Sequence, residues 1–223
     1  MEVYEIGMCM QWRHLLNIDI ICCLLYLEIT LRKLIDVWRT RYKADTLSGY
    51  EGDNSMNLIV AIDKENGIGL HGDQLYRIPE DLKYFQKMTI GKVVVMGHST
   101  LKALPGAGPL PGRGNIVLTS RENVTIDGCI VCRSLRELFE SIAPYESGDV
   151  FVIGGESVYK QLLEYCSLAY VTKIDCASPA DRFFPKLEEE KHWVLVSESE
   201  EREYEGLRFR YQVFENLAVK EVV

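Results

Sequence analysis

Two segments of the chain place glycines just before the start of an expected helix. Gly154-Gly155 follows the apolar run 150–153, and Met96-Gly97-His98-Ser99-Thr100 closes the apolar run 92–96. Glycines after a strand let the backbone approach a ligand, and the free N–H groups of a helix start can bind phosphate. Both segments favour a nucleotide site, although a tight turn and an ordinary helix N-cap would use the same residues.

Two further segments present charged side chains, Asp81 beside Glu80 in one and Arg113 in the other. Pro79-Glu80-Asp81-Leu82 sets a carboxylate in the first turn of a helix, and Pro109-Leu110-Pro111-Gly112-Arg113 is a stiff turn that presents one guanidinium. A carboxylate and a guanidinium are both groups that can pair with a ligand in bidentate geometry. The simpler interpretations are compensation of the helix dipole for Asp81 and a solvated position for Arg113.

Strands that alternate with helices must position these residues. Residues 66–78 are glycine-rich and expected to be irregular, whereas 193–214 should form a hairpin that turns at Glu205-Gly206. Alternating elements predict a mainly parallel sheet, and the hairpin predicts an antiparallel edge at the C-terminus. The pattern predicts strands at 57–63, 92–96, 116–119, 129–131, 150–153 and 168–174, and helices from Pro79, from Ser134 and over 157–165.

The composition excludes several classes of protein. The 223 residues hold 25 Lys and Arg against 33 Asp and Glu, and a net charge of −8 has the wrong sign for a nucleic-acid binder. Seven scattered cysteines include a single Cys-x-x-C, Cys129 to Cys132, and no nearby histidine completes a zinc set. We therefore expect a cytoplasmic monomer with free thiols, no metal site and no nucleic-acid partner.

Residues 1–55 differ in character from residues 56–223. Their apolar run 15–31 contains Asn17, Asp19 and Glu28, so it is a poor membrane span, and it lacks the features of a signal peptide. An amphipathic helix on a membrane or a partner is one interpretation. We favour another, in which translation starts at Met56, because Glu51-Gly52-Asp53 can be encoded by a purine-rich ribosome-binding sequence. We expect no membrane partner.

Taken in order, the motifs of residues 56–223 resemble those of dihydrofolate reductases of the bacterial chromosomal type. Each motif is modest alone, but their order and spacing are highly specific. The motifs are Ile68-Gly69, the segment 77–85 around Asp81, Val95-Met96-Gly97, the segment 109–115 around Arg113, the segment 152–159 around Gly154-Gly155, the segment 169–175 around Thr172, and Ala180-Asp181-Arg182-Phe183-Phe184-Pro185.

The resemblance implies a fold and a reaction. The implied fold is α/β, with a mostly parallel eight-stranded sheet, flanking helices and an antiparallel C-terminal edge. The implied reaction is the NADPH-dependent reduction of 7,8-dihydrofolate to 5,6,7,8-tetrahydrofolate, which supplies one-carbon metabolism. A hydride goes to C6 of the substrate and a proton goes to N5.

The resemblance also assigns substrate-side roles. Asp81 is implied to orient the pterin and favour protonation of N5, and burial should raise the pKa of this carboxyl. Thr172 matches the hydroxyl that bonds the carboxylate, Arg113 matches the clamp on the glutamate α-carboxylate, and Tyr76 should supply an aromatic wall of the catalytic loop. The other substrate-binding residues implied are Ile59, Leu82, Phe85, Leu110 and Ile153.

On the cofactor side, the resemblance implies a cis Gly154–Gly155 peptide beside the nicotinamide. His98 and Ser157 stand where the family has arginines that meet the 2′-phosphate, and Arg121 could restore one cation. NADPH is expected, with a weaker preference over NADH than usual. The implied cofactor-binding residues are Ala61, Ile68, Gly69, Gly97, His98, Ser99, Thr100, Thr119, Ser120, Arg121, Gly154, Gly155, Glu156, Ser157, Val158 and Tyr159.

Other departures and alternatives remain open from the sequence. Leu75-Tyr76 replaces the frequent Pro-Trp of the mobile loop, and Gln74 stands at a loop tip that is commonly apolar. Both departures leave open whether the loop gates the site as it does in the family. A riboflavin-pathway reductase shares the architecture, but Asp81 and Arg113 argue against it. A catalytically silent folate- or nucleotide-binding module is the other alternative, and the retention of Thr172 with both charged residues argues against that.

Overall fold

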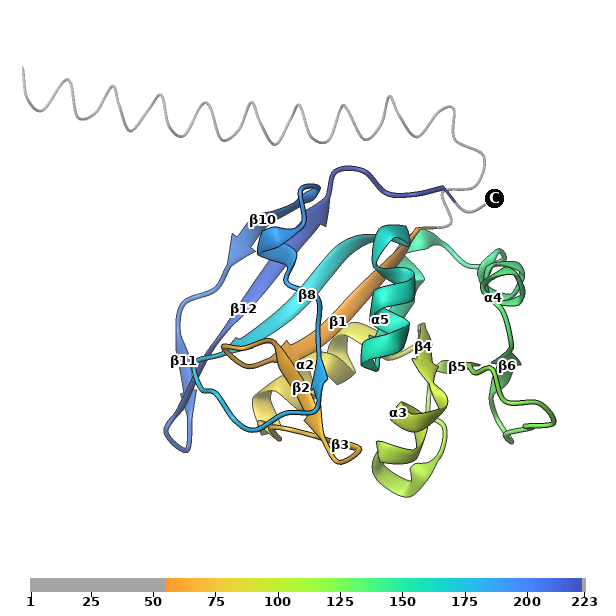
Figure 1. Ribbon diagram of the computed structural model, residues 1–223, viewed down its shortest axis with the longest axis horizontal. Helices are drawn as coiled ribbons and strands as arrows, with labels where there is room; N and C mark the ends of the chain where they lie inside the picture. Colours follow the sequence, from red (N-terminus) through yellow and green to blue (C-terminus); the bar gives the residue numbers. More distant parts are fainter. Residues whose placement is uncertain (1–54, 222–223) are drawn as a thin grey trace, which may run out of the picture. The chain divides into compact units, whose positions relative to one another are not determined.

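A twisted mixed sheet forms the centre of residues 55–221, the part of the chain that this computed structural model describes (Figure 1). Eight strands follow one another in the order β10-β12-β8-β1-β7-β4-β5-β6, and a ninth, β11, pairs with β12. In chain order the strands are β1 (Met56–Ile62), β4 (Val93–Gly97), β5 (Gly114–Leu118), β6 (Ile130–Cys132), β7 (Val150–Gly154), β8 (Cys166–Ile174), β10 (Trp193–Glu198), β11 (Arg202–Tyr204) and β12 (Leu207–Asn216).

The strand directions confirm the expected fold class. Pairs β8–β1, β1–β7, β7–β4, β4–β5 and β5–β6 are parallel, whereas β12 runs antiparallel to β8, β10 and β11. The expected C-terminal hairpin turns where predicted, with φ of 50° at Glu205 and 80° at Gly206. Positive φ at both turn residues matches the right-handed twist of the flanking strands, which is why glycine is favoured there. The short β11 is one strand more than the eight expected.

Each face of the sheet has its own apolar core. In β4, Val93 and Val95 pack into one core while Val94 and Met96 pack into the other, because successive side chains of a strand point to opposite faces. The first core includes side chains of α4 (Leu135–Ile142) and α5 (Glu156–Leu162). The second includes side chains of α2 (Pro79–Thr89) and α3 (His98–Ala103). Burial on both faces explains the continuous apolar runs of the central strands.

Local sequence determines where the helices begin. Pro79 occupies the first turn of α2, where its missing N–H costs nothing. Ser134 caps α4 by accepting a hydrogen bond from the Glu137 N–H at 3.2 Å, while the Glu137 carboxylate accepts the Arg133 N–H at 2.8 Å. The helix expected over 157–165 starts one residue earlier and ends as the 3₁₀ turn Leu163–Tyr165. The other 3₁₀ turns are Pro105–Ala107, Ser147–Asp149 and Leu187–Glu189.

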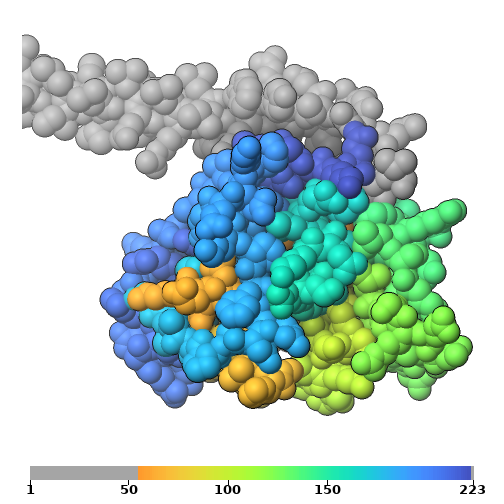
Figure 2. Space-filling model, in the orientation of Figure 1, coloured from red at the N-terminus to blue at the C-terminus, as the bar shows by residue number. Residues whose placement is uncertain are grey.

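A second, three-stranded sheet corrects the expectation that 66–78 is irregular. The strand β2 (Gly67–Leu70) lies between β3 (Asp73–Gln74) and β9 (Arg182–Phe183), and both pairs are antiparallel. Figure 2 shows the β2–β3 segment in orange against the blue segment that contains β9. Glycine has low strand propensity, so the extended form of this segment depends on pairing, with β3 nearby and with β9 more than 110 residues away.

The interpretations of residues 1–54, as an untranslated stretch or as an amphipathic helix with a linker, fall on residues outside the described part of the chain. Within residues 55–221, no helix combines the length and the apolar character needed to cross a membrane.

Candidate active site

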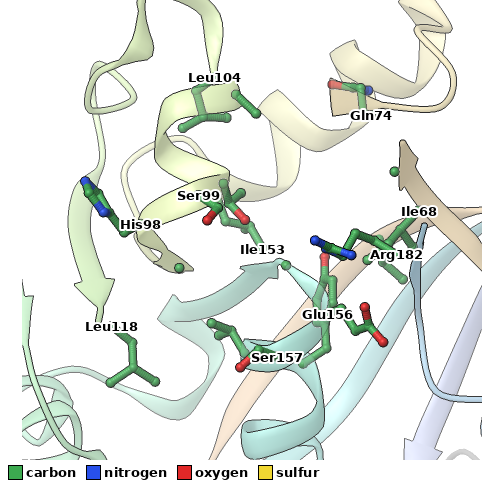
Figure 3. A pocket seen from close by; sticks show the side chains of 18 of the residues that line it. Ile68, Gln74, His98, Ser99, Leu104, Leu118, Ile153, Glu156, Ser157 and Arg182 are labelled. Carbon is green, nitrogen blue, oxygen red and sulfur yellow. The ribbon is translucent and has the colours of Figure 1, made fainter. Parts of the chain in front are cut away.

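A cavity of about 1180 Å³ opens where the carboxyl ends of β1, β4, β5 and β7 meet their following loops. This is the edge at which open α/β sheets bind ligands. The volume exceeds the range of about 300–1,000 Å³ typical of a pocket for one drug-sized molecule, so two small ligands can share it. Figure 3 shows His98 and Leu118 on one side of the cavity and Ile68, Gln74 and Arg182 on the other.

Most of the residues singled out from the sequence line this cavity. The exceptions are Tyr76, Thr172 and Gly154, which lie behind its surface. The lining residues that had been expected are Ile59, Ala61, Ile68, Gly69, Asp81, Leu82, Phe85, Gly97, His98, Ser99, Thr100, Leu110, Arg113, Thr119, Ser120, Arg121, Ile153, Gly155, Glu156, Ser157, Val158 and Tyr159.

The carboxylate of Asp81 is held by a hydroxyl from the sheet. Asp81 lies in the first turn of α2, and the Thr172 Oγ1 of β8 donates to its Oδ1 at 2.5 Å. Burial raises the pKa of Asp81, and the hydrogen bond from Thr172 opposes this by stabilising the charged form. Asp81 thus presents an oriented carboxylate whose proton affinity is higher than that of a surface aspartate. Thr172 acts on the site through Asp81 without lining the cavity.

Arg113 is placed by a turn that is itself clamped. The Asn115 side chain accepts the Leu110 N–H at 2.9 Å and donates to the carbonyls of Leu110 and Arg113, both at 3.0 Å. The Arg113 guanidinium donates to Thr89 Oγ1 at 3.0 Å, and its Cζ lies 5.9 Å from the centre of the Phe85 ring. A planar, permanently charged group is therefore fixed at the α2 side of the cavity.

The ends of β4 and β7 lie against α5 with little room for side chains. The Gly154–Gly155 peptide is cis, as the resemblance implies. A Cβ on Gly154 would lie 2.9 Å from the Tyr159 ring, and a Cβ on Gly97 would lie 3.2 Å from Val158. The Tyr159 hydroxyl, buried in the same region, donates to the Ile59 carbonyl at 2.8 Å. Only glycine fits this cradle, which leaves backbone groups next to the helix starts of α3 and α5.

Positive charge gathers at the α3 side of the cavity. The pKa of His98 is lowered, first by burial and then by the charges of Lys102 and Arg121. Because Lys102 and Arg121 both lower the pKa of His98, both lie near its imidazole. None of these three side chains has an ion-pair partner among residues 55–221. Ser120 and Ser157 line the cavity together with His98 and Arg121. Unpaired cations and hydroxyls form a site suited to a phosphate.

The structure places Tyr76 away from the cavity surface. Its hydroxyl donates to Ser178 Oγ at 2.9 Å, and its ring packs near Ala61 and Cys176. The Gln74 Nε2 donates to the Tyr76 carbonyl at 2.7 Å, so Gln74 takes the lining position in this loop. A tyrosine hydroxyl has one proton to donate, and here Ser178 accepts it.

Some lining residues were not expected from the sequence. Arg182 reaches the cavity from β9, and Arg133 and Lys160 line it near α4 and α5. Arg182 stands in a quoted motif, but the role of a cation there depends on the β2–β9 pairing, which the sequence does not reveal. Among residues 55–221, no group of three His, Cys, Asp or Glu side chains could hold a metal ion.

Comparisons with known proteins agree with this geometry. The dihydrofolate reductase family profile matches residues 55–216. The dihydrofolate reductase of Bacillus subtilis is 35% identical over 157 residues, which cover 70% of this chain and 90% of that protein. The dihydrofolate reductase of Aedes albopictus is 32% identical over 182 residues, covering 72% of this chain and 97% of that protein.

A solved structure gives the same answer. Dihydrofolate reductase from Enterococcus faecalis, complexed with NADP(H) and RAB-propyl, matches with a TM-score of 0.67 and 31% identity. The match covers 74% of this chain and 98% of that one. The chain belongs to the dihydrofolate reductase family.

Proposed function

We propose that the cavity reduces 7,8-dihydrofolate to 5,6,7,8-tetrahydrofolate with NADPH and that Asp81 is the residue on which the chemistry depends. The observation that carries this proposal is the 2.5 Å hydrogen bond from Thr172 to a half-buried Asp81 at the cavity wall. An ionised carboxylate in this position accepts two hydrogen bonds from the 2-amino group and adjacent ring nitrogen of a pterin. Its raised pKa then suits it to assist the transfer of a proton to N5, with water as the carrier.

The remaining substrate-side residues hold the molecule in place. Arg113 forms a bidentate pair with the α-carboxylate of the substrate's glutamate. Its guanidinium is oriented for this by the hydrogen bond to Thr89 and by the contact with the Phe85 ring. Leu82, Leu110 and Ile153 line the cavity between this clamp and Asp81 and exclude water from the rings. Ile59 contributes to the same wall from the end of β1.

The residues at the other end of the cavity fit a dinucleotide phosphate. The glycine cradle leaves backbone N–H groups free for a diphosphate at the starts of α3 and α5, where Ser99, Thr100 and Ser157 add hydroxyls. Arg121 supplies charge for the 2′-phosphate, and the neutral His98 imidazole offers a hydrogen-bond donor beside it. NADPH bound here supplies the hydride that is added to C6.

Deuterium transfer tests the proposed reaction. The full chain is incubated with dihydrofolate and NADPH deuterated at the reactive C4 position, and the product is analysed by mass spectrometry. We expect tetrahydrofolate that carries one deuterium at C6. Unlabelled product, or no product from a folded protein, would contradict the assigned reaction and favour a silent binding module.

We also propose that residues 56–223 carry the activity as a cytoplasmic monomer. The free thiols of Cys129, Cys132, Cys166 and Cys176 suit a reducing compartment. Amino-terminal sequencing of the native protein tests the start at Met56, and peptides from residues 1–50 would contradict it. Gel filtration tests the monomer, and elution at twice the mass of the chain would contradict it.

A further inference from the structure

Tyr211 places a phenol beside the Thr172–Asp81 pair. On β12, Tyr211 lies directly opposite Thr172 of β8, and opposite residues of an antiparallel pair project to the same face of the sheet. The Tyr211 ring centre lies 4.5 Å from that of Tyr84, which follows Asp81 by three residues on α2. Residues three apart share a helix face. Both α2, which carries Asp81, and β8, which carries Thr172, therefore lie against Tyr211.

The hydroxyl of Tyr211 is the unexplained part of this side chain. Its oxygen is buried and has no hydrogen-bond partner among residues 55–221. Buried polar groups are nearly always hydrogen-bonded, and an unsatisfied one destabilises the fold. A phenylalanine would pack as well as this ring does, so packing alone does not account for a tyrosine at this position.

The ring is held on its other sides as well. The Phe209 ring packs edge-on at 5.7 Å between centres, and the Arg202 guanidinium lies 5.5 Å from the Tyr211 ring centre. Arg202 is in turn ion-paired with Glu80, the neighbour of Asp81. The contacts with Tyr84, Phe209 and Arg202 thus hold the ring beside α2.

The charges around Tyr211 keep its hydroxyl a donor. Burial, followed by the nearby Asp81 and Glu80, raises the pKa of Tyr211 to about 12, and Arg202 opposes this. Tyr84 on α2 also acts on Tyr211 and raises its pKa, and Tyr170 on β8 lies near Tyr84 in turn; burial raises the pKa of both. At neutral pH the hydroxyl is therefore protonated and can only stabilise a carboxylate by donating to it.

We propose that Tyr211 is a positioning residue whose hydroxyl donates a hydrogen bond to the Asp81 carboxylate through one water molecule. This inference rests on the proposed function. A hydrogen bond to the charged form of an acid favours that form, so Tyr211 and Thr172 together oppose the effect of burial on Asp81. Tyr211 thereby sets the pH range over which Asp81 exchanges its proton during the reaction.

Tyr211→Phe tests the inference because it removes only the hydroxyl. The hydride-transfer rate is measured in single turnovers with saturating NADPH between about pH 5 and 9, since product release can mask chemistry in the steady state. In the plot of this rate against pH, the rate falls as Asp81 loses its proton. We expect this falling limb to move to higher pH by about 0.5–1 unit in the variant, the effect of one lost hydrogen bond on the pKa of Asp81. Tyr204→Phe, which removes a hydroxyl from β11 of the same hairpin, should leave the limb in place.

The outcomes separate this inference from the proposed function. A wild-type chain that does not oxidise NADPH in the presence of dihydrofolate would overturn the proposed function itself. Active wild type and Tyr204→Phe, with a Tyr211→Phe limb that coincides with both within about 0.2 unit, would show that the hydroxyl has no effect on Asp81.

A second measurement does not depend on the folding of the variant. In wild-type protein with ¹³Cζ-labelled tyrosines, the Tyr211 resonance should shift as Asp81 titrates, and the shift should be absent in Asp81→Asn. A Tyr211 resonance that stays constant through the titration of Asp81 would overturn the inference.

Discussion

The two ends of the cavity are built on different principles. At the substrate end, Asp81 and Arg113 already hydrogen-bond to protein groups, Thr172 and Thr89, at 2.5 and 3.0 Å. At the cofactor end, His98, Lys102 and Arg121 lie near one another without ion-pair partners among the described residues. The first arrangement fixes the protein groups that orient a ligand before it binds. The second leaves charge available for an incoming phosphate. Substitutions at the first end should therefore change catalysis or folate binding, and those at the second should change cofactor choice.

The largest effect is expected for Asp81→Asn. The amide keeps the size of the side chain but cannot accept two hydrogen bonds from the pterin or exchange a proton. Turnover at pH 7 should fall by about 100-fold or more, and it should recover in part as the pH falls and solvent protonates more dihydrofolate. Stopped-flow rates check this, and fluorescence titration should show that the affinity for NADPH is unchanged. A variant with the wild-type rate at pH 7 would refute the role of Asp81.

Arg113→Ala should sharpen the comparison within the substrate end. Loss of a charge-assisted bidentate pair costs about 1.5–3 kcal/mol, which corresponds to a rise of roughly 10- to 100-fold in the KM for dihydrofolate. Steady-state kinetics check this, with the KM for NADPH as the internal control. Arg113→Lys should recover only part of the loss, because an ammonium lacks the planar fork. Equal increases in both KM values would mean that Arg113 supports the whole cavity instead of one ligand.

Arg121→Ala tests the cofactor end. Removal of a cation that meets the 2′-phosphate should lower the ratio of kcat/KM for NADPH over NADH by about 5- to 10-fold, mainly through the KM for NADPH. Arg136→Ala is the matched control, because Arg136 on α4 is highly exposed and lies outside the cavity. If the two variants gave the same cofactor ratio, Arg121 would have no part in selecting NADPH.

His98 adds a pH dependence to the same end. Its pKa is lowered, so the imidazole is neutral at pH 7 and becomes charged only as the pH falls below its usual value of 6.5. Affinity for NADPH should therefore rise modestly as the pH drops toward 5, whereas affinity for NADH should not. Binding titrations at several pH values check this, and His98→Asn should remove the difference. The same slope for both cofactors would exclude His98 from the phosphate site.

The smallest effect concerns stability. Asp81 has a raised pKa in the folded state, so the folded protein binds this proton more tightly than the unfolded chain does, and stability falls as the pH rises from 3.8 through the raised value. Asp81→Asn removes that penalty and should raise Tm at pH 8 by about 2–4 °C, the shift that 1 kcal/mol gives in a domain of this size. The difference should shrink below pH 4. A lower Tm for Asp81→Asn at pH 8 would contradict the assigned origin of the pKa shift.

Much of this arrangement could be predicted from the sequence because it depends on local signals. Pro79 and Ser134 start their helices where expected, and the apolar runs of β1, β4 and β7 match strands buried on both faces. The helix starts and strands need only residue type, spacing and the two periodicities of regular structure. That Asp81, Arg113 and Gly155 share one cavity was predicted from the resemblance of the ordered motifs to the family, and all three line the cavity.

Features that depend on distant pairing could not be predicted in this way. Strand β2 pairs with β9, more than 110 residues away, and Arg182 of β9 lines the cavity. Tyr76 was expected in the site by position, but the hydroxyl of Ser178, 102 residues away, takes its hydrogen bond. Tyr211 was not selected at all, because its nearness to Asp81 follows from the register between β12 and β8.

The reduction of dihydrofolate with NADPH is tested most directly by following NADPH absorbance. The full chain is mixed with NADPH and dihydrofolate, then with NADH and dihydrofolate, with Asp81→Asn as the matched control. We predict rapid loss of absorbance that requires dihydrofolate, is faster with NADPH than with NADH and nearly disappears in the variant. No loss with either cofactor from a demonstrably folded wild-type protein would contradict the assigned function.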